Sequence, residues 1–241
     1  MKKFYLMMAV LFAAMPMVAQ TDGQDEEWQV DMRKNAFYFG PKAGVNFNTM
    51  TQPDEGKLFD KSDIGFSAGV ALRARFGKAT PDSQAGTGVF GVGVEAKYTQ
   101  NKVKTVATDD EGNDNAALSV DYFEAPVYVQ LYPLAKSNAL NSLYVEVGAA
   151  FAGTLRRKPA TLTVNDPNGQ FSSVTYKLDT DGSKLKGMDI RPLVGVGYTV
   201  PGTGLDLNAR YYLGTSKLAD NFGCKLNRFE VSVAWLFKAV F

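Results

Sequence analysis

The C-terminal segment of the chain, residues 228–241, constrains the fold more than any other part of the sequence. Its odd-numbered residues are all apolar and four of them are aromatic, whereas most of its even-numbered residues are polar or small. This period of two predicts a β-strand whose two faces meet two different environments. A soluble sheet normally buries its large aromatic residues in a core, so the fold depends on whether the same pattern recurs along the chain.

The same alternation recurs in seven earlier segments, which brings the total to eight strands. The polar connections after the odd-numbered strands are longer than those after the even-numbered strands. Membrane barrels with both termini in the periplasm show this alternation of outer loops and periplasmic turns. We therefore predict an all-β fold: an eight-stranded antiparallel up-and-down transmembrane β-barrel. The earlier strands are 37–48, 64–76, 90–99, 119–132, 143–152, 189–200 and 205–214, the longer connections 50–62, 105–116, 156–187 and 215–226, and the shorter ones 77–87, 133–141 and 201–204.

Two local features refine this prediction. Pro41 lies on the apolar face of the first strand, and proline interrupts a strand ladder, so a bulge or kink is expected there. Within the longest connection, 161–164 and 173–176 flank the turn sequence DPNG and are expected to pair as a short hairpin above the barrel.

The second face of the strands combines glycines with charges of both signs. Such glycines would only weaken a strand in open water, but eight strands enclose an interior that side chains just fill. Glycine then makes room for arginine and tyrosine, and enclosed charges must be paired. We predict a side-chain-filled lumen with a balanced structural charge network. Its members are Lys42, Arg73, Arg75, Glu95, Lys97, Glu124, Glu146, Asp189, Arg191, Asp206, Arg210 and Glu230.

The N-terminus reads as a targeting segment. Lys2 and Lys3 precede an apolar run at 4–18, which is typical of a secretory signal peptide. We expect residues 1–19 to be removed, residues 20–35 to form an acidic periplasmic leader and residues 36–241 to form the barrel in the cell outer membrane. A short membrane anchor is the alternative for the apolar run.

The sequence offers little for chemistry. Histidine is absent and Cys224 is the only cysteine, so the usual zinc sites and internal disulfides are not available. Residues 91–96 fit the pattern G-x-G-x-x-A, but a dinucleotide site needs a helix to begin there and the strand alternation continues. Acidic residues within 105–116 lack the spacing of an EF-hand loop and are interpreted as a solvated loop tip rather than a calcium site. We expect no catalytic residues, metal or cofactor, no enzymatic activity and, at a net charge of +1, no nucleic-acid partner.

Four motifs resemble a known family. The segments 37–47, 122–132, 194–198 and 205–214 are similar in order and spacing to the outer-membrane β-barrel domain family that includes PorT-like proteins. The resemblance implies an eight-stranded barrel in the Gram-negative cell envelope and no particular activity, although some members look like secretion-system components. The C-terminal strand resembles the sorting signal that barrel assembly machinery binds, with either Phe237 or Phe241 closing the sheet. Outer-membrane lipid is a further expected partner.

Three functions remain open at this point. The first is a non-enzymatic outer-membrane protein with a structural or recognition role through extracellular loops, in a secretion or envelope assembly. The second is a small passive, porin-like channel. The third is a soluble periplasmic ligand-binding barrel, whose polar face would point outward. The sequence identifies no ligand-binding residue and no extracellular partner.

Overall fold

Strands are the only regular elements in the described part of the computed structural model, and none of its elements is a helix able to cross a membrane. The strands are β1 (Ala36–Thr51), β2 (Lys61–Phe76), β3 (Phe90–Asp109), β4 (Gly112–Leu131), β5 (Leu143–Asn165), β6 (Phe171–Tyr176), β7 (Met188–Thr199), β8 (Leu205–Tyr212), β9 (Lys225–Trp235) and β10 (Phe237–Ala239). The structure describes residues 35–51, 61–77, 87–109, 112–137, 139–165, 171–176, 188–215 and 225–239.

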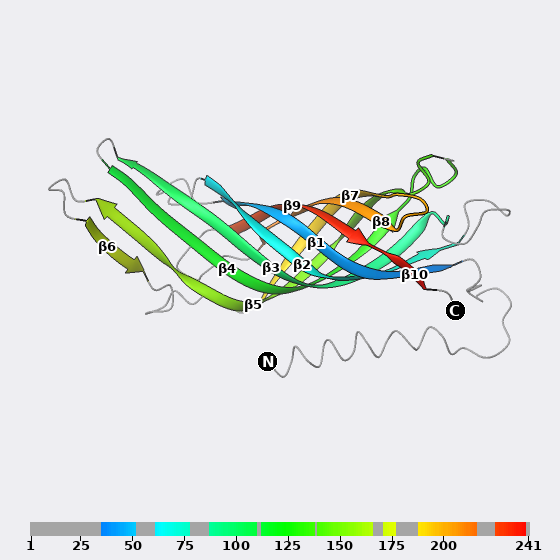
Figure 1. The fold of residues 1–241 in the computed structure, drawn as a ribbon, viewed down its shortest axis with the longest axis horizontal. Helices are drawn as coiled ribbons and strands as arrows, with labels where there is room; N and C mark the ends of the chain where they lie inside the picture. The colour runs from blue at the N-terminus through cyan, green and yellow to red at the C-terminus, as the bar shows by residue number, and fades with distance from the viewer. Residues whose placement is uncertain are drawn as a thin grey trace. The chain divides into compact units, whose positions relative to one another are not determined.

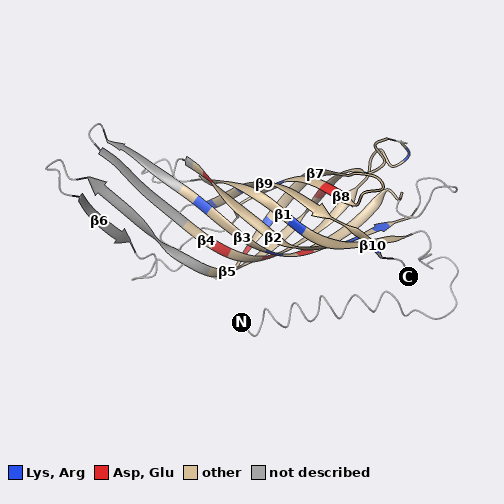
Figure 2. Ribbon diagram, in the orientation of Figure 1, with Lys and Arg blue, Asp and Glu red and all other residues tan. Residues whose placement is uncertain are grey.

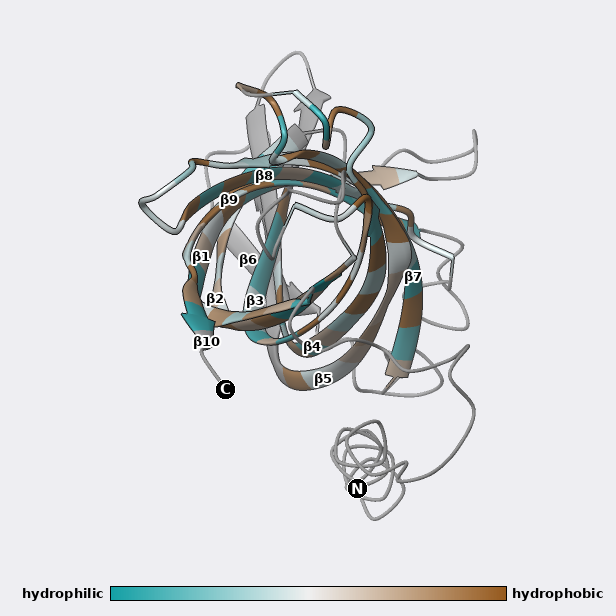
Figure 3. Ribbon diagram, turned by 90° about the vertical axis from the view of Figure 1, so that its right-hand side faces the viewer, coloured by the Kyte–Doolittle hydropathy of each residue, from teal (hydrophilic) through white to brown (hydrophobic). Residues whose placement is uncertain are grey.

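Antiparallel pairing closes these strands into a ring. Each barrel strand pairs with its neighbours along the chain, β5 pairs with β7 because β6 lies off the ring, and β9 returns to pair with β1. β9 and β10 occupy one position in the ring because both pair with β1. The ring therefore has eight positions, which confirms the predicted eight-stranded antiparallel barrel (Figures 1 and 3).

The two faces of the barrel are inverted relative to a soluble protein. Large apolar residues point outward, so that Val70, Val147 and Trp235 are 55%, 61% and 55% exposed. The alternate residues face inward and are buried; they are charged or polar side chains, tyrosines and small residues. Hydrophobic and hydrophilic residues accordingly alternate along the strands in Figure 3. Such a surface requires an apolar solvent on the outside of the barrel.

Strands β3, β4 and β5 run well beyond the predicted ends. The expected loop at 105–116 is wrong, because β3 and β4 stay paired to Asp109 opposite Gly112. The predicted hairpin in the long connection is present, with β5 and β6 paired from Ala160 opposite Tyr176 to Asn165 opposite Phe171. These strand ends extend beyond the part of the barrel that carries exposed apolar residues. Alternation of apolar and polar residues is no longer required there. Residues 52–60, 78–86, 166–170, 177–187 and 216–224 of the predicted connections lie outside the described residues, as do 1–34.

The irregularity expected at Pro41 falls on the neighbouring strand. The ladder between β1 and β2 continues through Pro41 opposite Val70 without a shift. On the other side, β9 ends and β10 begins around Leu236, whose N–H donates to the carbonyl of Gly204 at 2.7 Å. Beyond this break Phe237 pairs with Phe39, and their ring centroids are 5.8 Å apart. Phe237 therefore belongs to the closing strand, and Phe241 lies outside the described residues.

The interior side of β5 gives a direct test of how closely the barrel is filled. A Cβ atom at Gly148 would lie 2.1 Å from the carbonyl oxygen of Val127 and 2.7 Å from the Cα atom of Tyr128. We expect Gly148→Ala to destabilise the barrel by about 1–3 kcal/mol, because backbone atoms must move to admit the methyl group. Urea-induced unfolding in lipid vesicles measures this change.

The matched control for this substitution lies on the same strand. A Cβ atom at Gly153 would meet only the carbonyl oxygen of Phe123, at 3.9 Å, so Gly153→Ala should leave the unfolding midpoint nearly unchanged. Equal midpoints for the two variants would contradict a tightly filled interior.

Candidate functional site: the charged lumen

The twelve residues predicted for the charge network all lie on the inner side of the barrel. Eleven of them are buried, and Asp189 retains 11% exposure of its side chain. Figure 2 shows charged residues of both signs along the strands of the barrel body. These residues come from different strands and meet across the interior because alternate residues of every strand face inward.

Glu124 on β4 is the centre of the part of the network nearest the barrel end that the sequence predicts to be extracellular. Its carboxylate accepts two hydrogen bonds from Arg228, at 2.6 and 2.7 Å, and one from Arg191 at 3.3 Å. Lys97 Nζ lies 3.8 Å from the same carboxylate. Asp189 provides the second partner of Arg191, at 2.7 Å.

Arg228 is not among the residues predicted for the network, although it is completely buried. The signal was present in the strand alternation, because Arg228 shares the inner face of β9 with Glu230 and Ser232. With Arg228 included, seven basic residues face six acidic ones in the network.

The middle of the lumen holds a second set of pairs. Lys97 donates to both carboxylate oxygens of Glu230, at 2.8 and 2.7 Å. Glu95 accepts from Lys42 and from Arg210, each at 2.8 Å. The guanidinium group of Arg210 also forms an ion pair with Glu146. Each carboxylate in this layer is therefore held by a cation from another strand.

The periplasmic part is built around Arg73 and Asp206. Two nitrogens of Arg73 donate to the two carboxylate oxygens of Asp206, each at 2.9 Å. Tyr144 and Thr199 also donate hydroxyl hydrogen bonds to Asp206, at 2.9 and 2.6 Å. This paired, charge-assisted geometry is among the stronger hydrogen-bonding arrangements available to proteins.

Arg75 departs from the predicted pairing. No carboxylate in the described part of the chain pairs with it, and it donates instead to the backbone carbonyls of Gly88 at 2.7 Å and Asn141 at 2.6 Å. Its guanidinium carbon lies 3.6 Å from the centroid of the Tyr132 ring. Arg75 therefore connects the chain before β3 to the chain before β5 at the periplasmic end, and it carries the excess positive charge of the network.

Tyrosine rings separate the charged layers. Five buried tyrosines have a cationic side chain over the ring face, at 3.6–4.8 Å from ring centroid to cation. Glycines opposite two of these rings leave the space that they need, because a Cβ atom at Gly93 or Gly197 would lie 2.4 or 2.3 Å from a ring. Such contacts stabilise desolvated cations. The tyrosines are Tyr122, Tyr128, Tyr132, Tyr144 and Tyr212.

Apolar residues lie beyond the charges at both ends of the lumen. Val103, Val120 and Leu226 are buried at the extracellular end. At the other end Leu236 packs with Ala71 and Ala234. The described lumen is thus occupied by side chains along its length. Its buried charged groups are paired with one another, as buried charges must be, and they do not line an open cleft.

The remaining sequence candidates lie elsewhere. Residues 91–96 lie near the beginning of β3, which continues as an extended strand to Asp109, so no helix begins there. Asp109 and Asp114 belong to the outer ends of β3 and β4, whereas Cys224 lies outside the described residues. Within the described part of the chain, no group of three or more acidic or cysteine side chains is arranged to hold a metal ion.

Comparison with known proteins supports the barrel assignment. The family model described as outer membrane protein beta-barrel domain matches residues 18–220. The chain is similar to Ail of Yersinia pestis in complex with the heparin analogue sucrose octasulfate, with 15% identity, a TM-score of 0.42 and coverage of 83% of this chain and 99% of that chain.

Two further solved structures are similar. Neisserial surface protein A is similar with 15% identity, a TM-score of 0.43 and coverage of 83% of this chain and 97% of that chain. OprG from Pseudomonas aeruginosa is similar with 13% identity, a TM-score of 0.41 and coverage of 87% of this chain and 98% of that chain. Among curated proteins, none matches this chain.

The network makes Glu124 the most sensitive position in the lumen. Glu124→Gln would leave Arg228, Arg191 and Lys97 close together without their shared counter-charge. We expect a loss of about 3–5 kcal/mol in the free energy of unfolding, the usual effect of removing one partner from a buried pair. Urea-induced unfolding in vesicles, followed by tryptophan fluorescence, measures the loss.

Two comparisons show whether charge balance is the cause. Asp189→Asn removes a carboxylate at the edge of the network and should cost clearly less than Glu124→Gln, because Arg191 keeps Glu124 as a partner. Adding Arg228→Gln to Glu124→Gln removes the uncompensated cation and should restore part of the stability. Equal losses for the two single variants would contradict the central role of Glu124.

Proposed function

Because the chain belongs to the outer membrane protein β-barrel domain family, we propose that it is a non-enzymatic outer-membrane protein that acts through the sheet it carries beyond the barrel. This sheet consists of residues 104–109 of β3, 112–117 of β4, 160–165 of β5 and 171–176 of β6, and we call it the extracellular extension. With the periplasmic turns at the opposite end, it projects from the outer surface of the cell.

The filled lumen is the observation that carries this proposal. Side chains that face inward are committed to ion pairs, hydrogen bonds and ring contacts inside the barrel. The outward face is committed to lipid by its apolar residues. The extracellular extension is the part of the described chain left to contact partners outside the membrane.

The extracellular extension has the regular backbone that recognition surfaces often use. Asn115 of β4 lies opposite Thr163 of β5, and Thr163 lies opposite Ser173 of β6, so these strands continue one sheet beyond the ring (Figure 1). Rigid strands hold recognition residues in place with less ordering cost than a long irregular loop. We infer a role in adhesion or in a PorT-like secretion or envelope assembly.

The rest of the chain is assigned to export and insertion. We propose that residues 1–19 are a signal peptide and that 20–35 form a periplasmic leader. The closing strand, formed by β9 and β10, presents Trp235 and Phe237 on its outer face, where they are 55% and 49% exposed. Barrel assembly machinery would bind this strand during insertion.

The soluble ligand-binding alternative requires the opposite orientation of the strands. It would place Phe229, Val231 and Trp235 around an internal cavity, but these residues are 43%, 45% and 55% exposed on the outer face. The polar face that it would turn to water is buried instead.

The porin-like alternative is tested by electrical recording. We expect the purified barrel to insert into planar bilayers without stepwise conductance in concentrated KCl, because paired side chains and buried apolar residues occupy the lumen. A general porin inserted under the same conditions serves as the positive control. Reproducible current steps from the folded, heat-modifiable protein would favour the channel and overturn the recognition proposal.

Shortening the extracellular extension tests recognition directly. Residues 105–116 and 161–175 are each replaced by Asn-Gly, since Lys104 lies opposite Ala117 and Ala160 opposite Tyr176, and Asn-Gly favours a two-residue hairpin turn. We expect a barrel with the normal heat-dependent shift in gel mobility but no restoration of surface adhesion or secretion in a strain that lacks the protein.

The full-length Gly153→Ala variant is the matched control and should restore the phenotype. Complete restoration by the shortened barrel would show that the function resides in the barrel itself.

A further inference from the structure

Four buried polar side chains in the layer of the lumen around Glu124 each keep one polar atom without a hydrogen-bond partner among the described residues. The four residues are 0–2% exposed, so bulk solvent does not reach these atoms. A buried polar group without a partner costs free energy, and most such groups bind protein or ordered water. We call these residues the polar cluster: Asn46 and Asn48 on β1, Asn101 on β3 and Arg228 on β9.

The sheet brings the polar cluster together in one region of the interior. Asn48 lies directly opposite Arg228 in the ladder between β1 and β9, and Asn46 is the preceding inward residue of β1. From the other direction, Nη1 of Arg228 donates to Oδ1 of Asn101 at 3.5 Å. Nδ2 of Asn46 donates to the carbonyl of Gln100, the residue before Asn101, at 3.4 Å. The four side chains therefore meet between β1, β3 and β9.

An irregularity in the barrel wall lies beside the polar cluster. The register between β2 and β3 shifts between residues 62 and 67. Gly65 lies within this stretch, directly opposite Asn46. A Cβ atom at Gly65 would be 2.0 Å from the carbonyl oxygen of Gln100 and 3.4 Å from Nδ2 of Asn48. A larger residue at this position would therefore take up the space next to the asparagine amides.

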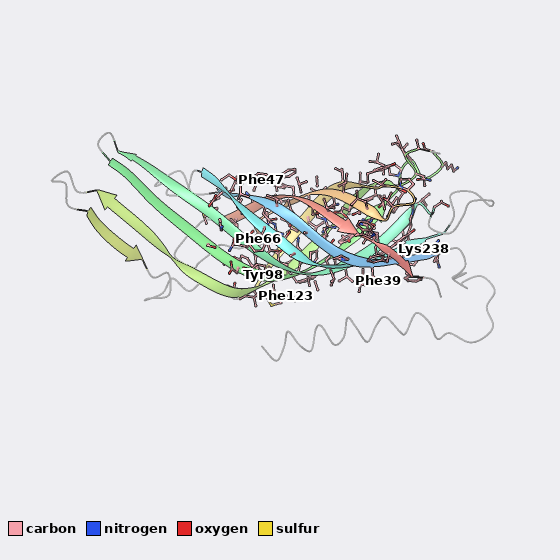
Figure 4. The ribbon with its side chains drawn as sticks, viewed as in Figure 1. Phe39, Phe47, Phe66, Tyr98, Phe123 and Lys238 are labelled. Atoms are coloured by element: carbon pink, nitrogen blue, oxygen red, sulfur yellow. The ribbon has the colours of Figure 1, made fainter. Side chains whose placement is uncertain are left out.

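Apolar side chains enclose this region on two sides. Phe47, Phe66 and Tyr98 lie over the shifted stretch on β1, β2 and β3 (Figure 4), and the ring centroids of Phe66 and Tyr98 are 5.6 Å apart. Val103 and Leu226, which are 2% and 4% exposed, follow the polar cluster on the inner faces of β3 and β9. A molecule held by the polar cluster would therefore exchange slowly with bulk solvent.

The unpartnered atoms define what the site can bind. Two are acceptors, the Oδ1 atoms of Asn46 and Asn48, since the amide nitrogens of both residues donate to backbone carbonyls at 3.4 and 3.5 Å. Two are donors, Nδ2 of Asn101 and Nε of Arg228. A carboxylate oxygen of Glu230 lies 3.7 Å from that Nε, beyond hydrogen-bond distance.

This combination of groups fits a neutral molecule. An anion would meet the two amide oxygens, and a cation would meet the guanidinium group of Arg228. A molecule that donates two hydrogen bonds and accepts two satisfies all four atoms, and water has this capacity. Buried waters in proteins typically make about three such bonds to otherwise unsatisfied polar groups.

We propose that the polar cluster is a binding site for an ordered water molecule, which accepts hydrogen bonds from Asn101 and Arg228 and donates to Asn46 and Asn48. The water connects β3 to the seam between β1 and β9, beside the stretch where the register of β2 and β3 shifts. A bridge of this kind is enthalpically close to a direct hydrogen bond. The site belongs to the barrel body, so it is independent of the recognition role proposed for the extracellular extension.

NMR of the wild-type protein in lipid nanodiscs tests the site. Magnetisation transfer from water is measured to the Nε proton of Arg228 and the Nδ2 protons of Asn101 in protein with isotope-labelled side chains. We expect cross-peaks at both groups with the sign of a bound water. A crystal structure should show one density peak at about 2.7–3.2 Å from the four unpartnered atoms.

A pair of matched variants separates this water from other sources of magnetisation. Asn48→Leu removes one acceptor and replaces it with an apolar group of similar size, and we expect the cross-peaks of both donors to be lost. Asn227→Leu is the control, because the Asn227 amide contacts Thr51 and Gly214 outside the lumen. This variant should keep the cross-peaks of the wild type. The heat-dependent mobility shift confirms that each variant is folded.

The absence of cross-peaks in the wild type, or equal cross-peaks in Asn48→Leu and the wild type, would overturn the proposal. The wild-type measurements decide the question even if Asn48→Leu does not fold. Crystals grown in bromide provide a further check, since an anomalous signal at the density peak would show that the site holds an anion instead of water.

Discussion

The pairing of Glu124 with Arg228 represents the constraint on which the whole interior depends. Eight strands enclose a space too narrow for bulk water, and every charge placed there loses its hydration. The chain compensates with carboxylates that each contact cations from other strands, as Glu124 does with Arg228, Arg191 and Lys97. The same contacts connect β3, β4, β7 and β9. The ion pairs that neutralise the buried charges therefore also hold these strands in register.

Strand alternation predicted the barrel and its filled lumen because each face of a membrane strand meets a single environment. Arg228 was left out of the predicted network although the same alternation places it on the inner face of its strand with Glu230. The described partners of Arg75 could not be predicted, since they are backbone carbonyls and a ring brought together by two turns. The paired ends of β3 and β4 were not predicted for a different reason: strands beyond the lipid need no apolar face, so the hydrophobic period that identifies strands is not required there. The hairpin of β5 and β6 was predicted instead from the turn sequence DPNG and its flanking segments.

Filling the lumen also separates the tasks of the molecule. Paired charges inside stabilise the barrel, and apolar residues outside keep it in the lipid. The strand ends beyond the membrane need neither paired inner charges nor an apolar outer face.

The break at Leu236 divides the seam between the first and last strands into unequal parts. Ten residue pairs join β1 to β9, and three join β1 to β10. The short part lies at the periplasmic end, where water is available to hydrate backbone groups that separate. The three residue pairs between β1 and β10 can therefore separate and re-form at a small free-energy cost, while the ten pairs between β1 and β9, which lie within the lipid, stay paired.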